Sequence, residues 1–510
     1  MAASEPADWV ERAARDQPQR SFLRTPTGRE ITYASLHEQS GRFAAALMRL
    51  SVVSGDRVAV QVDKSADAVL LYVACLRMGA VFVPINVANT ANEVDYFLRD
   101  SQASMAVIRP ADHALLGPQA TRAGVRHVET LGADGEGSLP DLVRQSGDGP
   151  ALPRSIGANS PAAIVYTSGT TGRSKGAMLT RANLASNAAA LVEAWRFTSR
   201  DIMLHTLPLF HIHGLFAAIN TVLASGSSLL LLPKFDAALT LRHLPQATVY
   251  MGVPTHYTRL LQLPELNREA TAGVRLFVSG SAPLPAETHH EFSRRTGHAI
   301  LERYGMTETL IITSNPFAGV RKPGSVGVPL PGIAVRVAGG ASGAQPQAAV
   351  GSLEVKGPNV FAGYWQDPGK TRGEFTADGW FKTGDLGYVD GEGYVHIVGR
   401  AKDLVISGGY NVYPKEVEAE LDALSGVLES AVFGVPHPDL GEGVTAVVVL
   451  RPAAVLSEAD IIDSIKARLA RYKVPKRVLL IDELPRNAMG KVQKNVLRAA
   501  YASLYGPGPA

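Results

Sequence analysis

Cysteine is almost absent from this sequence, since Cys75 is the single one in 510 residues. One cysteine excludes an internal disulfide bond and any metal site built from several cysteines. Cys75 lies in the apolar, helix-like stretch AVLLYVACLRMGA. We therefore interpret it as a small buried side chain rather than as a nucleophile.

The sequence also lacks long apolar runs and a strong excess of either charge. No apolar run approaches the about 20 residues that span a membrane, and the first 20 residues mix acids and bases without the apolar core of a secretory signal. The net charge of +3 gives no argument for binding to nucleic acid or to a membrane. We expect a cytoplasmic protein whose partners are small molecules.

Short strand-like runs alternate with helical segments over roughly the first two thirds of the chain. A helix is expected at 65–78, and the segment 109–160 is expected to form loops with one or two strands. The expected strands are 57–62, 81–85, 105–108, 162–166, 228–232, 248–252 and 275–278. This alternation predicts an α/β fold of layered, largely parallel sheets.

After residue 333 the pattern changes to short strands and turns. We expect a small antiparallel β-barrel subdomain at about 320–400, with an exposed hairpin tip at 338–349. The next segment predicts helices at 414–424 and 457–472 and strands at 430–435, 445–450 and 477–481. The chain therefore divides into an N-terminal domain, 1–400, and a small α+β C-terminal domain, 401–510.

The stretch 161–178, PAAIVYTSGTTGRSKGAM, joins a strand to a loop of Thr, Ser and Gly that carries Arg173 and Lys175. Glycines let a backbone approach an anion closely, and its N–H groups and hydroxyls can then surround phosphate oxygens. A Walker P-loop is excluded, because two residues rather than four separate Gly169 from Gly172.

This stretch resembles the phosphate loop of the adenylate-forming enzymes, which include acyl-CoA synthetases, luciferases and peptide-synthetase adenylation domains. Further motifs of that superfamily follow in the expected order: PLFHIHGLF (208–216), VSGSAPL (278–284), RYGMTET (303–309), FKTGDLGYVD (381–390), GRAKDLVISGGYNVYP (399–414) and LPRNAMGKVQK (484–494). The resemblance covers nearly the whole chain and implies a mobile C-terminal domain.

The resemblance implies binding of ATP with Mg²⁺. Tyr304 can stack on the purine, Glu308 with Thr167 can hold Mg²⁺, and Asp385, placed after a glycine in a turn, can take both ribose hydroxyls. The implied nucleotide contacts are Thr167, Ser168, Gly169, Thr170, Thr171, Gly172, Lys175, Ser281, Ala282, Glu302, Arg303, Tyr304, Gly305, Met306, Thr307, Asp385 and Arg400.

The same resemblance implies the remaining sites. Lys491, His211 and Glu308 are the expected catalytic residues, whereas His213 is expected to pack. The acid is expected to contact His211, Arg259, Ser281 and Met306. Coenzyme A is expected at Lys402, Ser407, Gly408 and Gly409, with Lys402 also as the hinge between the domains.

Within the superfamily the phrases ERYGMTET, VISGGYNVYPKEVE and LPRNAMGKVQKNVLR are most similar to malonyl-CoA synthetases. That similarity implies joining of malonate to coenzyme A through an acyl-adenylate, with Arg259 pairing with the distal carboxylate. An apolar Ile312, where a polar side chain is expected, would favour methylmalonate or a longer acid. A ligase for short or medium-chain monocarboxylates and an enzyme that loads a carrier protein stay open. The resemblance also marks Lys491 as a target of a lysine acetyltransferase and deacetylase.

Overall fold

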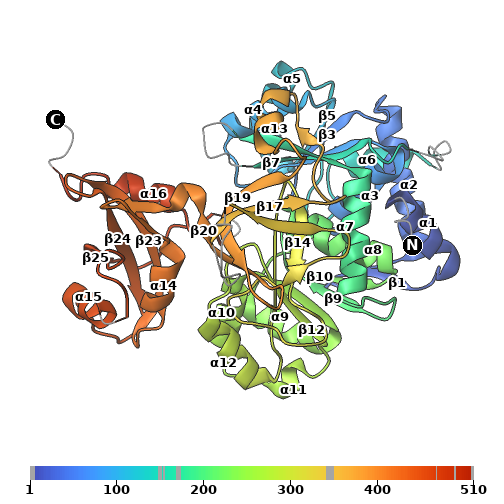
Figure 1. The fold of residues 1–510 in the computed structure, drawn as a ribbon. Helices are drawn as coiled ribbons and strands as arrows, with labels where there is room; N and C mark the ends of the chain where they lie inside the picture. The colour runs from blue at the N-terminus through green and yellow to red at the C-terminus, as the bar shows by residue number, and fades with distance from the viewer. Residues whose placement is uncertain are drawn as a thin grey trace.

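The computed structural model describes residues 6–147, 152, 156–167, 174–339, 350–466, 468–487 and 490–506. The chain forms a large body and a smaller domain that lies to one side of it and is drawn in orange to red in Figure 1. Among the described residues, no helix combines the length and the apolar character needed to span a membrane.

A nine-stranded sheet forms one layer of the large body, in the order β15-β14-β13-β12-β11-β9-β10-β1-β2. The strands from β1 to β13 along this order are parallel to one another, and the remaining pairs are antiparallel. The strands are β1 (Ser21–Arg24), β2 (Glu30–Thr32), β9 (Ile202–His205), β10 (Ser228–Leu231), β11 (Val249–Gly252), β12 (Leu276–Ser279), β13 (Leu301–Met306), β14 (Leu310–Ser314) and β15 (Val328–Pro329).

A seven-stranded sheet, in the order β18-β8-β7-β4-β3-β5-β6, forms the second layer. It is parallel from β7 to β6, which confirms the predicted layered α/β fold with largely parallel sheets. Its strands are β3 (Arg57–Gln61), β4 (Val81–Pro84), β5 (Met105–Ile108), β6 (His127–Thr130), β7 (Pro161–Thr167), β8 (Lys175–Thr180) and β18 (Gly363–Tyr364).

Helices fill the space between the two sheets and cover their outer faces (Figure 1). Every residue of the central helix α3 (Ala66–Met78) is buried, including Cys75, so burial raises the pKa of that thiol. The helices that share the inner core are α1 (Pro6–Asp16), α2 (Tyr33–Arg49), α6 (Ser138–Gln145), α7 (Arg181–Ala194), the π-helix η2 (His213–Asn220) and α8 (Thr221–Ser225). The outer helices are α4 (Ala91–Ser101), α5 (His113–Arg122), α9 (Ala237–His243), α10 (Pro254–Leu261), α11 (Arg268–Thr271) and α12 (Ala286–Thr296).

The segment 109–160 differs from its prediction, because it contains the helices α5 and α6 besides the strand β6. Gly117 and Pro118 lie inside α5 and obscure its periodicity in the sequence. Both are poor helix formers, and tertiary packing overrides such local preferences. Leu116 and Ala120 of α5 are buried against the outer face of the seven-stranded sheet.

A four-stranded antiparallel sheet follows, in the order β16-β17-β19-β20. Its strands are β16 (Ala334–Ala338), β17 (Gly351–Lys356), β19 (Phe381–Val389) and β20 (Val395–Arg400), and α13 (Pro368–Glu374) precedes β19. The antiparallel pairing agrees with the prediction. In the described residues, β16 pairs with β17 and β20 pairs with β19, and Val395 of β20 also exchanges backbone hydrogen bonds with residues 326 and 327. Most of the expected hairpin tip, from residue 340 to 349, lies outside the described residues.

The smaller domain has its own apolar cores on both faces of a sheet built around the long hairpin β23–β24. Its helix α15 ends at Lys466, earlier than the expected 457–472. The elements are β21 (Val405–Ser407), β22 (Tyr410–Val412), α14 (Pro414–Asp422), β23 (Val427–His437), β24 (Gly441–Leu450), α15 (Glu458–Lys466), β25 (Arg477–Leu480) and α16 (Lys494–Ala500).

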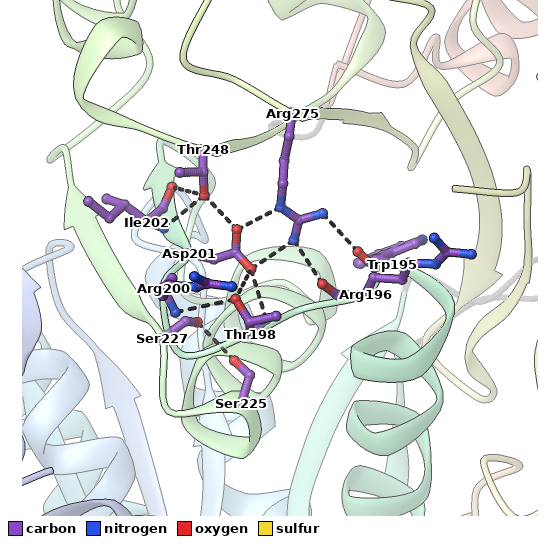
Figure 2. Close-up of polar contacts among 10 residues, drawn as sticks. All are labelled: Trp195, Arg196, Thr198, Arg200, Asp201, Ile202, Ser225, Ser227, Thr248 and Arg275. Carbon is purple, nitrogen blue, oxygen red and sulfur yellow. Dashed lines mark hydrogen bonds and ion pairs between the residues drawn. The ribbon is translucent and has the colours of Figure 1, made fainter. Parts of the chain in front are cut away.

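A polar cluster ties the amino-terminal ends of β9, β11 and β12 together (Figure 2). Asp201 Oδ1 accepts from Arg275 Nε at 2.7 Å and from Thr248 Oγ1 at 2.7 Å. Asp201 Oδ2 accepts from Arg275 NH2 at 2.8 Å and from the backbone N–H of Thr198 at 2.8 Å. Arg275 also donates to the carbonyl oxygens of Trp195 and Arg196. This edge of the sheet is therefore closed by groups that satisfy one another.

Candidate active site

The predicted site residues of the large body gather at the opposite edge, where β9, β12 and β13 end. Parallel strands end at one edge of a sheet, and in open α/β sheets this edge is where ligands bind. Tyr304, Glu308, Asp385 and Arg400 form what we call the nucleotide side. His211, His213, Ser281 and Arg303 form the acid side.

Asp385 lies inside β19 and not in the turn that the sequence suggests. Gly384, at φ +71°, and a register shift at residues 386–387 distort the strand there, so the local sequence looks like a turn. Arg400, its cross-strand partner, donates from Nε to Asp385 Oδ1 at 2.8 Å, and the Tyr304 hydroxyl donates to Oδ2. Burial raises the pKa of Asp385, and the Arg400 charge opposes that shift. The result is a rigid carboxylate, suited to a pair of ribose hydroxyls.

The ends of the phosphate loop are fixed by the hairpin of β7 and β8, in which Thr167 pairs with Lys175. Ser168, Gly169, Thr170, Thr171 and Gly172 lie outside the described residues. Lys175 Nζ lies 5.6 Å from the centre of the Tyr364 ring. Burial and the nearby Lys370 lower the pKa of Lys175. The loop therefore ends at an ordered cation.

Glu308 lies in the turn of the hairpin that joins β13 to β14 and is buried. Its Oε1 accepts a hydrogen bond of 2.9 Å from the Tyr364 hydroxyl, so Tyr364 connects Glu308 to Lys175. Burial raises the pKa of Glu308. A bound cation would remove that penalty on the carboxylate. Mg²⁺ is usually held by one or two carboxylates and by substrate phosphates, and Glu308 fits such a site.

Two other predicted nucleotide contacts support the backbone around the site. Glu302 Oε1 accepts from the backbone N–H of Leu284 at 2.9 Å and so holds the turn after β12, where Ala282 lies. Burial raises the pKa of Glu302 to about 7. A Cβ on Gly305 would lie 1.9 Å from the Leu310 carbonyl oxygen, so only glycine lets the hairpin close. Met306 ends β13, and Thr307 follows it in the turn.

The acid side is built around two histidines at the start of η2. The backbone N–H of His213 donates to His211 Nδ1 at 3.1 Å, and His213 Nδ1 lies 3.3 Å from Ser281 Oγ. Burial lowers the pKa of His211 to about 3, and the charges of Lys491 and Arg303 add to the shift. His211 is therefore neutral at physiological pH. Ser281 has φ +72°, a strained conformation of the kind that clusters at functional sites.

Arg303 is a buried guanidinium whose Nε and NH2 have no hydrogen-bond partner among the described residues. A Cβ on Gly280 would lie 2.4 Å from its Cζ, so the glycine makes room for it. Burial lowers the pKa of Arg303 to about 9. Its charge lowers the pKa of both His211 and His213. The assignment of Arg303 to the nucleotide stays a prediction, and the structure adds that its charge acts on the two histidines of the acid side.

Arg259 lies in α10, which begins at Pro254, close to the predicted start near Thr255. It is exposed and forms no ion pair with an acidic side chain among the described residues. Its charge lowers the pKa of His256 on the same helix, a residue that the sequence did not single out. The acid side thus contains the cation Arg303, and a second cation, Arg259, lies one helical turn from His256, whose charge acts on His213.

Family models of two AMP-binding enzyme domains match this chain. The model of the AMP-binding enzyme covers residues 10–365, and the model of its C-terminal domain covers residues 416–491. The chain belongs to the AMP-binding enzyme family. This membership confirms the resemblance to adenylate-forming enzymes.

Several members of the family are similar over almost the whole chain. The malonate–CoA ligase of Mus musculus, a mitochondrial protein, is 36% identical over 92% of this chain and 87% of its own. The indoleacetate–CoA ligase of Aromatoleum aromaticum is 35% identical over 97% of this chain and 98% of its own. The ATP-bound structure of MatB from Rhodopseudomonas palustris is 52% identical, with a TM-score of 0.94 over 98% of this chain and 99% of its own. The apo structure of the same protein has a lower TM-score of 0.83.

In this AMP-binding enzyme, the smaller domain places Lys491 near both sides of the site. Burial, together with the charges of Arg400 and Arg303, lowers the pKa of Lys491 to about 8 against the opposing effects of Asp385 and Glu308. Lys491 still contacts solvent. Its backbone N–H donates to Asn487 Oδ1 at 3.0 Å, within a turn closed by a hydrogen bond from Arg486 NH1 to the Gly490 carbonyl oxygen at 2.6 Å.

The residues predicted for coenzyme A are not at this site in the observed domain orientation. Ser407 ends β21, and Gly408 and Gly409 form the turn to β22. Their neighbours Ile406 and Tyr410 are exposed. The hairpin therefore faces solvent while Lys491 faces the site.

Lys402, the predicted hinge, is exposed in the short helix η4 (Ala401–Asp403). Arg400 is fixed to Asp385 of the large body, and Asp403 accepts from Arg498 of α16 at 2.7 Å. The hinge thus lies between two ion pairs, one on each domain.

Two contributors to the site escape the sequence analysis. Tyr364, in the run FAGYWQ, links Glu308 to Lys175, and His256 lies beside Arg259. Tyr364 lies in the short strand β18, and the aromatic pair of Tyr364 and Trp365 was the only local signal for it. No local signal exists for His256, because its partners come from other strands.

Proposed function

We propose that this AMP-binding enzyme is an ATP-dependent malonate–CoA ligase that forms malonyl-adenylate and releases pyrophosphate, then AMP. The observation that supports malonate as the substrate is the presence of two cations, Arg303 and Arg259. Arg303 is buried with donors unpaired, and Arg259 lacks an acidic partner among the described residues. A monocarboxylate would leave one of them without an anion, whereas a dicarboxylate supplies one for each.

In the first half-reaction, a carboxylate oxygen of the acid attacks the α-phosphorus of ATP, and pyrophosphate leaves. Two anions must meet, so the protein's contribution is to hold them together and to supply positive charge. Lys491 and Lys175 provide that charge, and Asp385 fixes the ribose. Because His211 is neutral, it can lie beside the carboxylate and the phosphate without protonating either of them. Mg²⁺, when bound at Glu308, would neutralise phosphate charge on the leaving group.

In the second half-reaction, the thiol of coenzyme A attacks the acyl carbon and AMP leaves. We propose that the smaller domain rotates about Lys402 and exchanges Lys491 for the Gly408–Gly409 turn, which is a hinge motion. The TM-score is higher with the ATP-bound form of the relative than with its apo form. This difference supports the proposal that the observed domain orientation serves the first half-reaction.

The deciding experiment is a panel of mono- and dicarboxylic acids, assayed for pyrophosphate release with ATP and Mg²⁺ and for thioester formation with free coenzyme A. We expect the highest kcat/KM for malonate, with methylmalonate as the acid to compare next. A monocarboxylate that exceeds malonate would contradict the substrate assignment. Adenylation without transfer to free coenzyme A would favour a carrier protein as the acceptor.

Two finer points remain part of this proposal. Lys491 contacts solvent and has a lowered pKa, so a larger share of its amine is neutral and open to enzymatic acetylation. Acetylation would remove the charge that the first half-reaction uses, and adenylation by a homogeneously acetylated sample tests this. A cytoplasmic location is proposed as well, and cell fractionation tests it.

A further inference from the structure

His256 is a half-buried histidine whose ring is fixed on one edge and on one face. Its Nδ1 lies 3.0 Å from the Tyr250 hydroxyl, which itself lies 3.3 Å from Thr206 Oγ1. The ring of Phe235 stacks on it, with centroids 3.8 Å apart and an angle of 5° between the planes. These contacts come from β11 and from the segments that follow β9 and β10, so they set the direction in which the free edge points.

The free edge of this ring carries Nε2, which makes no hydrogen bond with a described residue and is not enclosed. Burial lowers the pKa of His256 to about 3, and the charges of Arg259 and Lys64 add to that shift. The ring is therefore neutral at physiological pH. When the Tyr250 hydroxyl donates to Nδ1, the proton of the neutral ring is on Nε2, which is then a donor.

Among the described residues, the groups whose charge acts on His256 are basic and include no carboxylate. They are Arg259, one turn further along α10, and Lys64, whose Nζ donates to the His205 carbonyl oxygen at 2.8 Å. The exposed Arg259 is the firmer cation of the two, because burial lowers the pKa of Lys64 well below its ordinary value. His256 in turn acts on His213 of the acid side. His256 and Arg259 are three residues apart on α10 and so share one face of that helix. An anion is the ligand that complements this arrangement.

We infer that His256 is a specificity-determining residue, whose Nε2–H donates to the distal carboxylate of the acid beside the guanidinium of Arg259. This inference rests on the proposed function and assigns one of its contacts. Stacking on Phe235 alone would be served equally by phenylalanine. The histidine adds a donor, and the Thr206–Tyr250 pair aims it.

The test compares His256→Phe with His256→Gln, using malonate and propionate as three-carbon acids that differ by one carboxylate. Phenylalanine keeps the stack on Phe235 and removes the donor, whereas glutamine keeps a donor and loses the stack. A hydrogen bond to a charged group is worth roughly a ten- to hundredfold change in kcat/KM. We expect His256→Phe to lower kcat/KM for malonate by at least about tenfold while propionate changes less than about threefold. His256→Gln should recover most of the malonate activity.

His298→Phe is the matched control, because His298 packs against Phe277 at 5.2 Å in the segment before β13, away from the acid side. It should leave the ratio of the two acids unchanged. A His256→Phe enzyme that keeps the malonate-to-propionate ratio of the wild type would overturn the inference, whether both activities are retained or both fall. If the wild type itself does not prefer malonate, the proposed function fails first, and the inference falls with it.

Discussion

The two edges of the nine-stranded sheet differ in how their buried polar groups are paired. At the amino-terminal edge, Asp201 uses both oxygens on Arg275, Thr248 and Thr198 (Figure 2). At the carboxyl-terminal edge, buried atoms of Arg303, His213, His205 and Ser279 lack partners among the described residues.

This difference separates residues that stabilise the fold from residues kept for a ligand. Buried polar groups in native proteins are usually hydrogen-bonded, and exceptions call for an explanation. Because both edges belong to the same strands, the difference in pairing between them does not come from a difference in strand composition or packing. Among the described residues of β9, β12 and β13, the unpaired buried atoms lie toward the carboxyl-terminal edge, which binds ligands in this class of sheet. Unpaired atoms also occur elsewhere, as at Arg20 and Ser21 beside the start of β1, so the contrast holds for these central strands.

The comparison predicts that removing a charge at the carboxyl-terminal edge costs activity rather than stability, and Lys491 gives the largest expected effect. Lys491→Ala should lower adenylation by about a thousandfold, the size of effect seen when a charge-stabilising donor is lost. Formation of the thioester from supplied acyl-AMP should be spared. Pyrophosphate exchange and a thioester assay measure the two halves separately.

The pH profile sharpens the same prediction. Lys491 has a folded pKa of about 8, so it is cationic below that pH and loses its charge above it. The kcat/KM of adenylation should therefore fall as the pH rises through about 8. The thioester step should not show this decrease. Equal loss of both half-reactions in Lys491→Ala would refute the division of roles.

Arg259 gives the next largest effect. Losing a charge-assisted contact to a buried carboxylate costs about 1.5–3 kcal/mol, and stranding that carboxylate costs more. Arg259→Ala should lower kcat/KM for malonate by roughly a hundredfold, at about 1.4 kcal/mol per decade. Propionate should change little, and Arg259→Lys should recover only part of the loss, because the bidentate fork is gone. A parallel fall for both acids would make Arg259 structural.

Glu308 should show a smaller effect, which depends on the metal. Glu308→Gln keeps the shape and the hydrogen bond from Tyr364 but removes one negative charge. Adenylation should slow by more than about tenfold, and the concentration of Mg²⁺ needed for half-maximal rate should rise. Titration of Mg²⁺ at saturating ATP measures both. An unchanged Mg²⁺ requirement would show that Glu308 does not bind the metal.

The sequence predicted the fold correctly, because long motifs fix many positions at once, and the roles of the site residues stay predictions. It placed Asp385 in a turn, since Gly384 imitates one, whereas the distorted strand β19 carries it. It assigned Arg303 to the nucleotide, since its neighbours Tyr304 and Thr307 point to that role. That assignment stays a prediction, and the structure adds that Arg303 packs against Gly280 and that its charge acts on the two histidines.

Contacts between distant segments explain what the sequence did not reveal. His256 depends on Tyr250, Thr206 and Phe235, which no spacing rule connects. The Asp201–Arg275 pair spans 74 positions of the chain and carries no motif. Both are set by the register of neighbouring strands, which a single sequence does not specify.

Asp201 provides the smallest expected effect on activity and completes the comparison. Burial alone would raise the pKa of Asp201, but hydrogen bonds from Arg275, Thr198 and Thr248 outweigh it and hold the pKa below its ordinary value. A lowered folded pKa contributes stability that is present above the unfolded pKa and is lost as the pH falls through the folded one. Asp201→Asn should lower the free energy of unfolding by about 2 kcal/mol near neutral pH, since the partly exposed Arg275 loses its counter-ion. It should also reduce the loss of stability toward acidic pH.

Denaturant unfolding at pH 7 and pH 4 measures this effect of Asp201→Asn, while kcat/KM for malonate should stay within about twofold of the wild type. A large loss of activity in a stably folded Asp201→Asn enzyme would show that the two edges are coupled, and the separation between them would fail.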